Sequence, residues 1–373
     1  MNNNDILRMA GYMAPIISSL LCLLLSLAYR LHYGKNTPTS SRLLRLTIVY
    51  FGIVAVNWLN TLLYIFYPAV FVYVNTSYYI CLMLVSVVFY HLVYVLTATG
   101  AKRFPVIHYV IPVVIVATFA GWSLFVPFDV QLALVTSRGA VQPGYEAYSK
   151  FFIYRFPTAS IYCFVYLLPV IRQLLHYRKV ITGYSADEGR SSLQWLYLLM
   201  ILFVGRISLP VAALFFTIQV MAESFLTLLP GGILIVQHAV LCYNILGGNY
   251  VIIKTEKADK KEKGKALNKE MFEAYIHETK PYLHPELKIT DLTLPMITNR
   301  TYLSDFINQE YDMNFSRYIN LLRLEELERL RKDPAYNHFS EVGLILQAGF
   351  SSYQGFRRFV RTEKVLSNRP CIN

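Results

Sequence analysis

Long apolar runs alternate with short polar connections over the first two thirds of the chain, and a charged helical pattern replaces them after residue 250. A helix crosses a bilayer core with ~20 consecutive, mostly apolar residues. Seven segments meet this requirement: roughly 9–29, 46–67, 78–98, 106–127, 151–171, 195–216 and 225–247. A soluble protein with buried core helices is the alternative, but seven such runs joined by short loops favour a polytopic transmembrane helical bundle.

From residue 268 onward, apolar residues follow a helical spacing that stops and restarts at turn residues. Phe272, Tyr275 and Ile276 share one helix face, and Pro281 and Pro285 then interrupt the pattern. A longer amphipathic helix follows, with apolar residues at Phe315, Ile319, Leu322, Leu324, Leu327 and Leu330. No segment shows the alternation of a β-strand. The sequence therefore predicts an all-α protein with a membrane domain over 1–249, a charged juxtamembrane linker over 250–267 and a helical domain over 268–373.

The formal net charge of +12 suggests nucleic-acid binding, but most of it lies in the membrane half. Residues 1–249 contain 15 Lys and Arg against 6 Asp and Glu, whereas the remainder contains 20 against 17. Basic residues accumulate in the cytoplasmic loops of membrane proteins. Here they cluster in the first, third and fifth connections and after the last span; Arg138 and Lys150, in the fourth, are exceptions. We therefore expect a multi-pass protein of the inner (cytoplasmic) membrane, with the N-terminus outside and the C-terminal domain in the cytoplasm.

Polar residues within the predicted spans are candidates for ligand binding, because a charge in a bilayer core is costly without a partner. They are Arg206, Arg155, His91, His238 and Asn57. Arg206 lies near the middle of its span, whereas Arg155 lies near a span end, from which a long side chain can reach the membrane surface. Bonds to neighbouring helices are the structural alternative. The sequence does not identify the small-molecule or membrane signal that these residues would recognise.

The C-terminal domain contains two helix-turn-helix patterns. The first is ITDLTLPMITNRTYLSDFINQEYDMNFSRYINLLRLEEL over residues 289–327, and the second is EVGLILQAGFSSYQGFRRFVRTEK over 341–364. Together they resemble the DNA-binding domain of the AraC/XylS family of transcription regulators, over roughly residues 270–370. The resemblance implies a cytoplasmic double helix-turn-helix domain that binds double-stranded DNA. RNA polymerase is a further candidate partner, and the oligomeric state stays open.

A helix-turn-helix inserts the N-terminal part of its second helix into the major groove. Asn299 can cap that helix in the first unit, and Tyr302, Leu303 and Phe306 are expected to face the core. The candidate DNA-binding residues of this unit are Asn299, Arg300, Thr301, Ser304 and Asp305. A solvated helix face is the alternative at each position.

In the second unit, Gly349 supplies a turn residue that tolerates positive φ, and Ser351 or Ser352 can cap the following helix. The candidate DNA-binding residues are Ser352, Tyr353, Gln354, Arg357 and Arg358. Gln reads adenine and Arg reads guanine through bidentate hydrogen bonds.

Six residues depart from the family pattern. Pro295 falls within the first scaffold helix, where proline removes a hydrogen bond, and Ile297 stands where a turn-forming residue is usual. Leu327 and Gly343 replace alanines, and Val365 and Asn368 take the places of the usual Gly and Pro after the second recognition helix. We expect these departures to weaken the second unit and its binding to DNA, and not to change the fold.

No HExxH, GxSxG or Walker-type sequence and no CxxC pair occurs, so the sequence indicates no catalytic site, no metal site and no cofactor. We therefore expect a membrane-anchored, sequence-specific DNA-binding transcription regulator that works by one-component signalling, with a membrane or extracytoplasmic cue as its input. The alternative is a membrane receptor or transporter whose degenerate C-terminal domain binds a protein partner rather than DNA.

Overall fold

The computed structural model describes residues 3–33, 41–99, 103–212, 228–253 and 267–367, and these residues form helices joined by turns. Within those ranges no β-strand forms, and the nearest equivalent is an isolated antiparallel bridge between Ser185 and Lys288. The all-α prediction is confirmed for this part of the chain. Chain contacts define two compact units, which are described separately. The membrane unit comprises Met1–Leu96, Lys102–Gln173 and Gln194–Gly248, and the C-terminal unit comprises Thr97–Ala101, Leu174–Leu193 and Asn249–Asn373.

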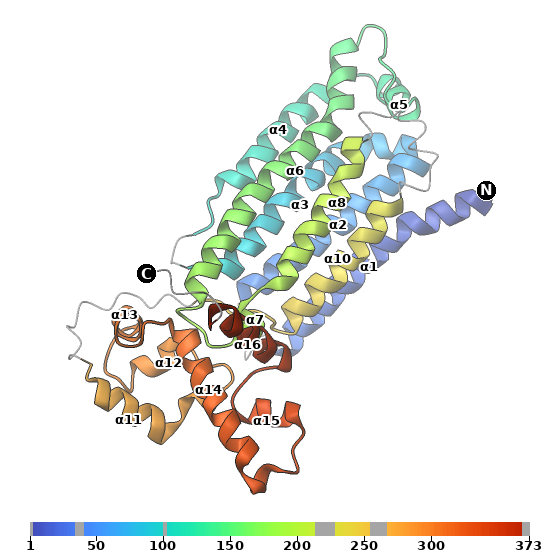
Figure 1. Ribbon diagram of the computed structural model, residues 1–373. Coiled ribbons are helices and arrows are strands. Elements are labelled where there is room, and N and C mark those ends of the chain that lie inside the picture. The colour runs from blue at the N-terminus through green and yellow to red at the C-terminus, as the bar shows by residue number, and fades with distance from the viewer. Residues whose placement is uncertain (1–2, 34–40, 100–102, 213–227, 254–266, 368–373) are drawn as a thin grey trace. The chain divides into compact units, whose positions relative to one another are not determined.

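The membrane unit is a set of long helices that run alongside one another, with the short α5 near one end of them (Figure 1). The long helices are α1 (Asn3–Tyr33), α2 (Ser41–Phe66), α3 (Pro68–Thr97), α4 (Ile107–Ser123), α6 (Glu146–Ile181), α8 (Gln194–Ala212) and α10 (Leu229–Leu246), and α5 is Phe128–Thr136. The residues of α6 from Leu174 onward belong to the C-terminal unit.

Five of these helices are long and apolar enough to cross a membrane: α1, α2, α3, α6 and α10. They coincide with five of the seven predicted spans. The predicted span 106–127 is instead the shorter α4, which meets α5 at 116°, so that the pair is either one broken span or a re-entrant segment. Predicted span 195–216 begins as α8 and is helical to Ala212, and its last residues lie outside the described ranges.

Close packing in the membrane unit depends on rings and small residues. An aromatic cluster fills the space among α3, α4 and α6, where Phe119 stacks on Tyr148 and meets Tyr79 edge-on. Helices α1 and α10 approach closely at Gly231, where a β-carbon would lie 2.9 Å from Pro15 Cγ. Small residues at such crossings bring helix backbones together in membranes.

Arg138, one of the two basic exceptions in the fourth connection, has a structural partner. Its Nη1 donates to the carbonyl oxygen of Tyr64 at 3.2 Å, near the C-terminal end of α2, and its guanidinium lies 4.9 Å from the Tyr64 ring. The last carbonyls of a helix have no internal donors and form its negative end. The charge of Arg138 therefore stabilises the end of α2.

The C-terminal unit is built from shorter helices (Figure 1). They are α7 (Glu188–Ser191), α11 (Lys269–Thr279), η2 (Pro281–Leu283), α12 (Ile289–Thr293), α13 (Arg300–Tyr311), α14 (Phe315–Lys332), η3 (Pro334–Tyr336), α15 (Glu341–Gln347) and α16 (Tyr353–Ser367). The 18-residue α14 is the long amphipathic helix expected from the sequence. Its Leu327 and Leu330 pack with Ile345, Phe350 and Phe359 from the α15–α16 segment.

Candidate nucleic-acid interface

The first predicted helix-turn-helix consists of α12, a turn and α13. Asn299 caps α13, because its Oδ1 accepts from the Tyr302 amide at 2.9 Å. Pro295 does not lie inside a helix, since α12 ends at Thr293 and the proline falls in the turn that follows. The expected helix interruption at Pro295 is therefore corrected: the scaffold helix is only five residues long and avoids the cost.

The turn before α13 contains a strained residue. Ile297 has φ of +48° and is 77% exposed. A β-branched side chain is disfavoured in the left-handed region, where its Cβ crowds the backbone. The departure from the family pattern at this position is thus a backbone conformation that glycine or asparagine would adopt at lower cost.

The predicted polar residues in the first turns of α13 differ in their exposure to solvent. Thr301 and Asp305 are exposed, whereas Arg300 and Ser304 are half-buried. Leu303 is buried as predicted, but Tyr302 is 40% exposed, so its expected place in the core is wrong. Two adjacent positions on a helix lie ~100° apart, and Leu303 takes the core-facing position.

The second predicted helix-turn-helix consists of α15, a turn and α16. Gly349 has φ of +95°, and a β-carbon there would lie 2.4 Å from the carbonyl oxygen of Tyr282. Both the turn conformation and this close approach require glycine. Ser352 is the cap of the next helix, because its Oγ accepts from the Gly355 amide at 3.1 Å. The expectations for the Gly349 turn and for a serine cap are confirmed.

The first turns of α16 are polar and basic. Tyr353, Gln354 and Arg357 are exposed, and Arg358 turns back to donate from Nε to the Gln354 carbonyl at 3.4 Å. Arg317 of α14 fixes the far end of this helix through a two-pronged contact with Glu363, at 2.9 and 3.0 Å. The exposed side chains therefore project from a helix whose position in the unit is fixed.

Helix α14, which lies between the two elements in the sequence, contains a buried arginine. Arg323 is 1% exposed, and its Nε donates to the Tyr282 carbonyl at 2.7 Å. Its Nη2 donates to the His284 carbonyl at 2.8 Å, and its Nη1 donates to the Ala186 carbonyl at 3.1 Å. These carbonyls come from two segments far apart in the sequence, so Arg323 ties both segments to α14.

The segment that contributes Ala186 was not predicted to belong here. Residues 182–191 connect α6 to α8, and they pack with the C-terminal unit. The Thr182 carbonyl accepts from the Ser316 amide at 3.0 Å, and the Ala186 amide donates to the Leu287 carbonyl at 3.1 Å. We call residues 182–186 the anchor of this loop.

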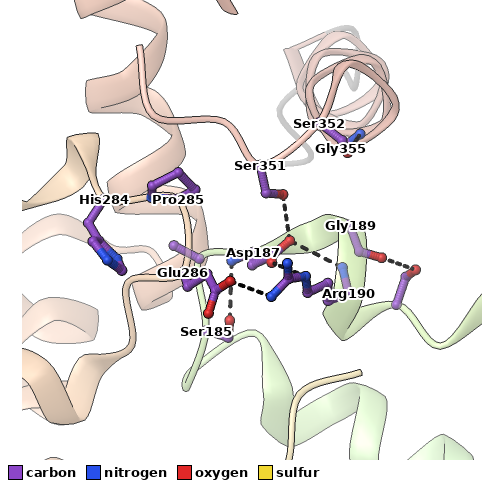
Figure 2. Close-up of polar contacts among 12 residues, drawn as sticks. Ser185, Asp187, Gly189, Arg190, His284, Pro285, Glu286, Ser351, Ser352 and Gly355 are labelled. Carbon is purple, nitrogen blue, oxygen red and sulfur yellow. Dashed lines mark hydrogen bonds and ion pairs between the residues drawn. The ribbon is translucent and has the colours of Figure 1, made fainter. Parts of the chain in front are cut away.

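The remainder of the loop, residues 187–191, contacts the start of α16, as Figure 2 shows. The Ser351 hydroxyl donates to Asp187 Oδ1 at 2.7 Å, and Arg190 pairs with Glu286. A β-carbon on Gly189 would lie 3.2 Å from the hydroxyl oxygens of both Ser351 and Ser352. We call residues 187–191 the lid segment. The sequence pattern does not predict these contacts, because they join residues that are 96 positions apart for Arg190 and Glu286 and 164 apart for Asp187 and Ser351.

An ionic cluster lies at the other end of α14. Glu326 is buried and accepts from Arg329 at 2.8 Å and from Lys280 at 3.2 Å. The hydrogen bond from Arg329 is the largest influence, and together with Lys280 it holds the pKa of Glu326 below its usual value despite the opposing effect of burial.

Among the ligand-binding candidates of the membrane unit, Arg155 is the most buried cation. It is 2% exposed, so it does not extend to the membrane surface as its place near a span end suggested. Its Nη1 contacts Asn75 Oδ1, and its guanidinium lies 3.8 Å from the Phe152 ring centroid and 4.9 Å from that of Phe156. Nε and Nη2 have no hydrogen-bond partner among the described residues. Cation–π contacts thus replace most of its hydrogen bonds.

The two histidine candidates have other partners. His91 Nε2 accepts from Arg42 Nη2 at 3.1 Å, which places the ring proton on Nδ1, 2.8 Å from the Tyr109 hydroxyl. His238 Nδ1 lies 3.2 Å from Ser18 Oγ, and its ring meets Phe51 edge-on. Arg155, His91 and His238 therefore bond three different sets of side chains.

Asn57 is buried on α2, and its Oδ1 has no hydrogen-bond partner in the described part of the chain. Arg206 belongs to α8, but its side chain lies outside what the structure describes. No group of three or more His, Cys, Asp or Glu side chains that could hold a metal ion occurs within the described residues.

No family model, curated protein or solved structure matches this chain.

Proposed function

We propose that this chain is a membrane-anchored transcription regulator whose C-terminal unit binds double-stranded DNA through two AraC-type helix-turn-helix elements. The observation that supports this best is a repeated arrangement. In both elements a short helix leads through a residue of positive φ, Ile297 or Gly349, into a side-chain-capped helix with exposed polar first turns. One long helix, α14, joins the two.

The chemistry of the exposed residues supports the same proposal. Gln354 and Arg357 are suited to read adenine and guanine edges, and Thr301 accepts or donates one hydrogen bond. Helix α14 has 18 residues, which gives a length of ~27 Å at 1.5 Å per residue. That length suits a connector between reading helices in successive major grooves, about 34 Å apart on one face of the DNA.

In this proposal the membrane unit is the sensor. Basic residues in alternate connections orient the N-terminus outward and the C-terminal unit toward the cytoplasm, where DNA is accessible. Arg155 has polar capacity to spare, since two of its nitrogens have no hydrogen-bond partner in the described residues, and the amide of Gln237 in α10 is likewise without one. An anionic group on a ligand would satisfy them.

The test uses the full-length protein in lipid nanodiscs and a random-sequence pool of DNA duplexes. Repeated selection should enrich a sequence with two short half-sites about one helical turn apart. Arg357→Ala should weaken binding to the selected duplex by ~1–3 kcal/mol and relax preference at one base position.

Arg361→Ala is the matched control, because it removes the same charge one turn further along α16 from the exposed first turns. It should weaken all duplexes slightly and equally, as loss of a phosphate contact does. If no sequence is enriched, or if the two variants behave alike, base readout by α16 is wrong. A C-terminal unit that then retains a protein partner would support the protein-binding alternative.

A further inference from the structure

The loop between α6 and α8 reaches the first turns of both proposed reading helices. On α13, the Arg300 guanidinium lies 5.0 Å from the Tyr184 ring, and a β-carbon on Gly183 would lie 3.7 Å from Ser304 Oγ. Arg300 and Ser304 are the two half-buried members of the predicted DNA-binding set on this helix. The loop therefore accounts for contacts at both of them.

On α16 the contact is closer still. A β-carbon on Gly355 would lie 3.4 Å from the Gly189 amide nitrogen and 3.8 Å from Gly189 Cα. Gly189 and Gly355 thus allow backbone to approach backbone, and Ser351 and Ser352 border the same spot. Figure 2 shows the lid segment lying against this end of α16. The lid segment thus borders Ser351, Ser352 and Gly355 at the N-terminal end of α16, whereas Gln354 and Arg357 stay exposed.

Asp187 places a carboxylate at this contact. Its buried carboxylate accepts the Ser351 hydroxyl at 2.7 Å and the Arg190 amide at 3.1 Å. Serine hydroxyls and the first amides of recognition helices are groups that bind DNA phosphates. The carboxylate of Asp187 therefore takes the place that a phosphate oxygen would take beside Ser351.

We propose that the lid segment, residues 187–191, is an autoinhibitory lid that competes with DNA for the start of α16, and that its displacement through α6 and α8 is how the membrane unit controls DNA binding. This inference rests on the DNA-binding function proposed above. The anchor, residues 182–186, holds the loop to the unit through backbone bonds to Ser316, Leu287 and Ile289 and through Arg323. The lid segment is joined to the α16 side by one hydroxyl–carboxylate bond and glycine packing, and to Glu286 by the exposed ion pair of Arg190. It can therefore open while the anchor stays bound.

The expected change in DNA affinity follows from the fraction of molecules in which the lid is open. If the lid is open in about one molecule in ten, the apparent affinity for DNA is about tenfold weaker than that of the open form. Asp187→Asn keeps the shape of the residue and its ability to accept from the Arg190 amide, but it removes the negative charge beside Ser351. It should strengthen DNA binding by up to about tenfold.

The charge control is Glu278→Gln, which removes one carboxylate from the exposed face of α11. Removal of any acidic charge strengthens binding to DNA slightly through long-range repulsion, and salt screens that effect. The lid is supported if Asp187→Asn raises the affinity for DNA much more than Glu278→Gln does, and if this difference persists at higher salt. Equal gains at the two positions would overturn it.

A reversible crosslink tests the same inference directly. The β-carbon position of Gly189 lies 3.2 Å from Ser351 Oγ, which suits a disulfide between Gly189→Cys and Ser351→Cys. Neither residue belongs to the predicted base-reading set. The full-length double variant in nanodiscs is titrated with a duplex selected on the wild-type protein, first oxidised and then reduced.

The oxidised protein should bind the duplex at least about tenfold more weakly than the same sample after reduction. Equal affinity in both states, with binding retained, would overturn the lid and leave the DNA-binding function standing. Binding in neither state, with no binding by the wild-type protein to any duplex of the pool, would instead overturn the proposed function and the lid with it.

Discussion

The two units each bury an arginine almost completely, and they treat it differently. Arg323 in the C-terminal unit donates to the carbonyls of Tyr282, Ala186 and His284, and its guanidinium is held from several sides. Arg155 in the membrane unit has one amide partner, Asn75, and is otherwise enclosed by aromatic rings. Both side chains are among the largest of those fully buried.

The difference shows what each unit depends on. In the C-terminal unit, the directional hydrogen bonds of Arg323 join separate segments, beside the apolar packing of α14 on the α15–α16 segment. The membrane unit is held by apolar and aromatic packing, so its arginine leaves polar capacity unused. The hydrogen bonds of Arg323 thus join segments of its unit, whereas two nitrogens of Arg155 have no hydrogen-bond partner among the described residues.

The largest expected effect is at Arg323. Arg323→Met should destabilise the C-terminal unit by ~3–5 kcal/mol, because it leaves the buried carbonyls of Tyr282, Ala186 and His284 without donors. Hydrogen exchange of α14 amides in the full-length protein is the measurement. Lys332→Met, at an exposed position of the same helix, is the control and should change exchange little. Similar protection in both variants would contradict the structural role of Arg323.

A smaller effect is expected at Arg155. Arg155→Met should destabilise the membrane unit by ~1–2 kcal/mol, mainly because the amide of Asn75 loses its partner. Adding Asn75→Leu should recover most of that loss. Fluorescence during thermal unfolding reports on this unit, since Trp58, Trp122 and Trp195 all belong to it. If Arg155→Met lowers stability as much as Arg323→Met does, and if Asn75→Leu does not restore that stability, the two arginines do not differ in the way described.

Ile297 is the strained point of the otherwise well-bonded C-terminal unit. Ile297→Asn should stabilise the unit by ~0.5–1 kcal/mol, because asparagine adopts φ near +48° at lower cost and the isoleucine side chain is exposed. The denaturant concentration at the midpoint of unfolding of the C-terminal unit should rise. Ile297→Val, which stays β-branched, should leave it unchanged; an equal rise in both variants would point away from backbone strain.

The smallest effect is pH-dependent. Contacts with Arg329 and Lys280 lower the pKa of Glu326 in the folded state, so Glu326 adds stability above its unfolded pKa and loses it as pH falls through the folded value. Both cationic partners are well exposed, so the contribution should be less than ~1 kcal/mol. Glu326→Gln should flatten the acid side of the stability profile of this unit. An unchanged slope would assign the acid loss to other carboxyl groups.

Local sequence signals predicted local structure well. The Asn299 and Ser352 caps, the Gly349 turn and the amphipathic α14 follow from residues within a few positions of one another. Five of the seven spans follow from apolar length alone. The sharp bend between α4 and α5 was missed, because a window of apolar residues does not show where a helix ends.

Contacts between distant segments could not be predicted. The loop over 182–191 has no helix-turn-helix pattern and reads as an ordinary basic connection, yet it supplies a carbonyl to Arg323 and a carboxylate to Ser351. Arg155 was likewise placed by its distance from a span end, whereas the rings that enclose it come from several helices. Which distant side chains contact one another cannot be predicted from a single sequence, because these contacts form only when the chain folds.

Whether the full-length protein binds specific DNA in living cells can be measured by a genome-wide map of the DNA that crosslinks to it. We predict a small set of sharp sites that share one two-part sequence, and we predict that Arg357→Ala removes these sites without lowering the amount of protein in the membrane. A map with no enrichment over a chain truncated before residue 267, with the full-length protein present in the membrane, would contradict this prediction.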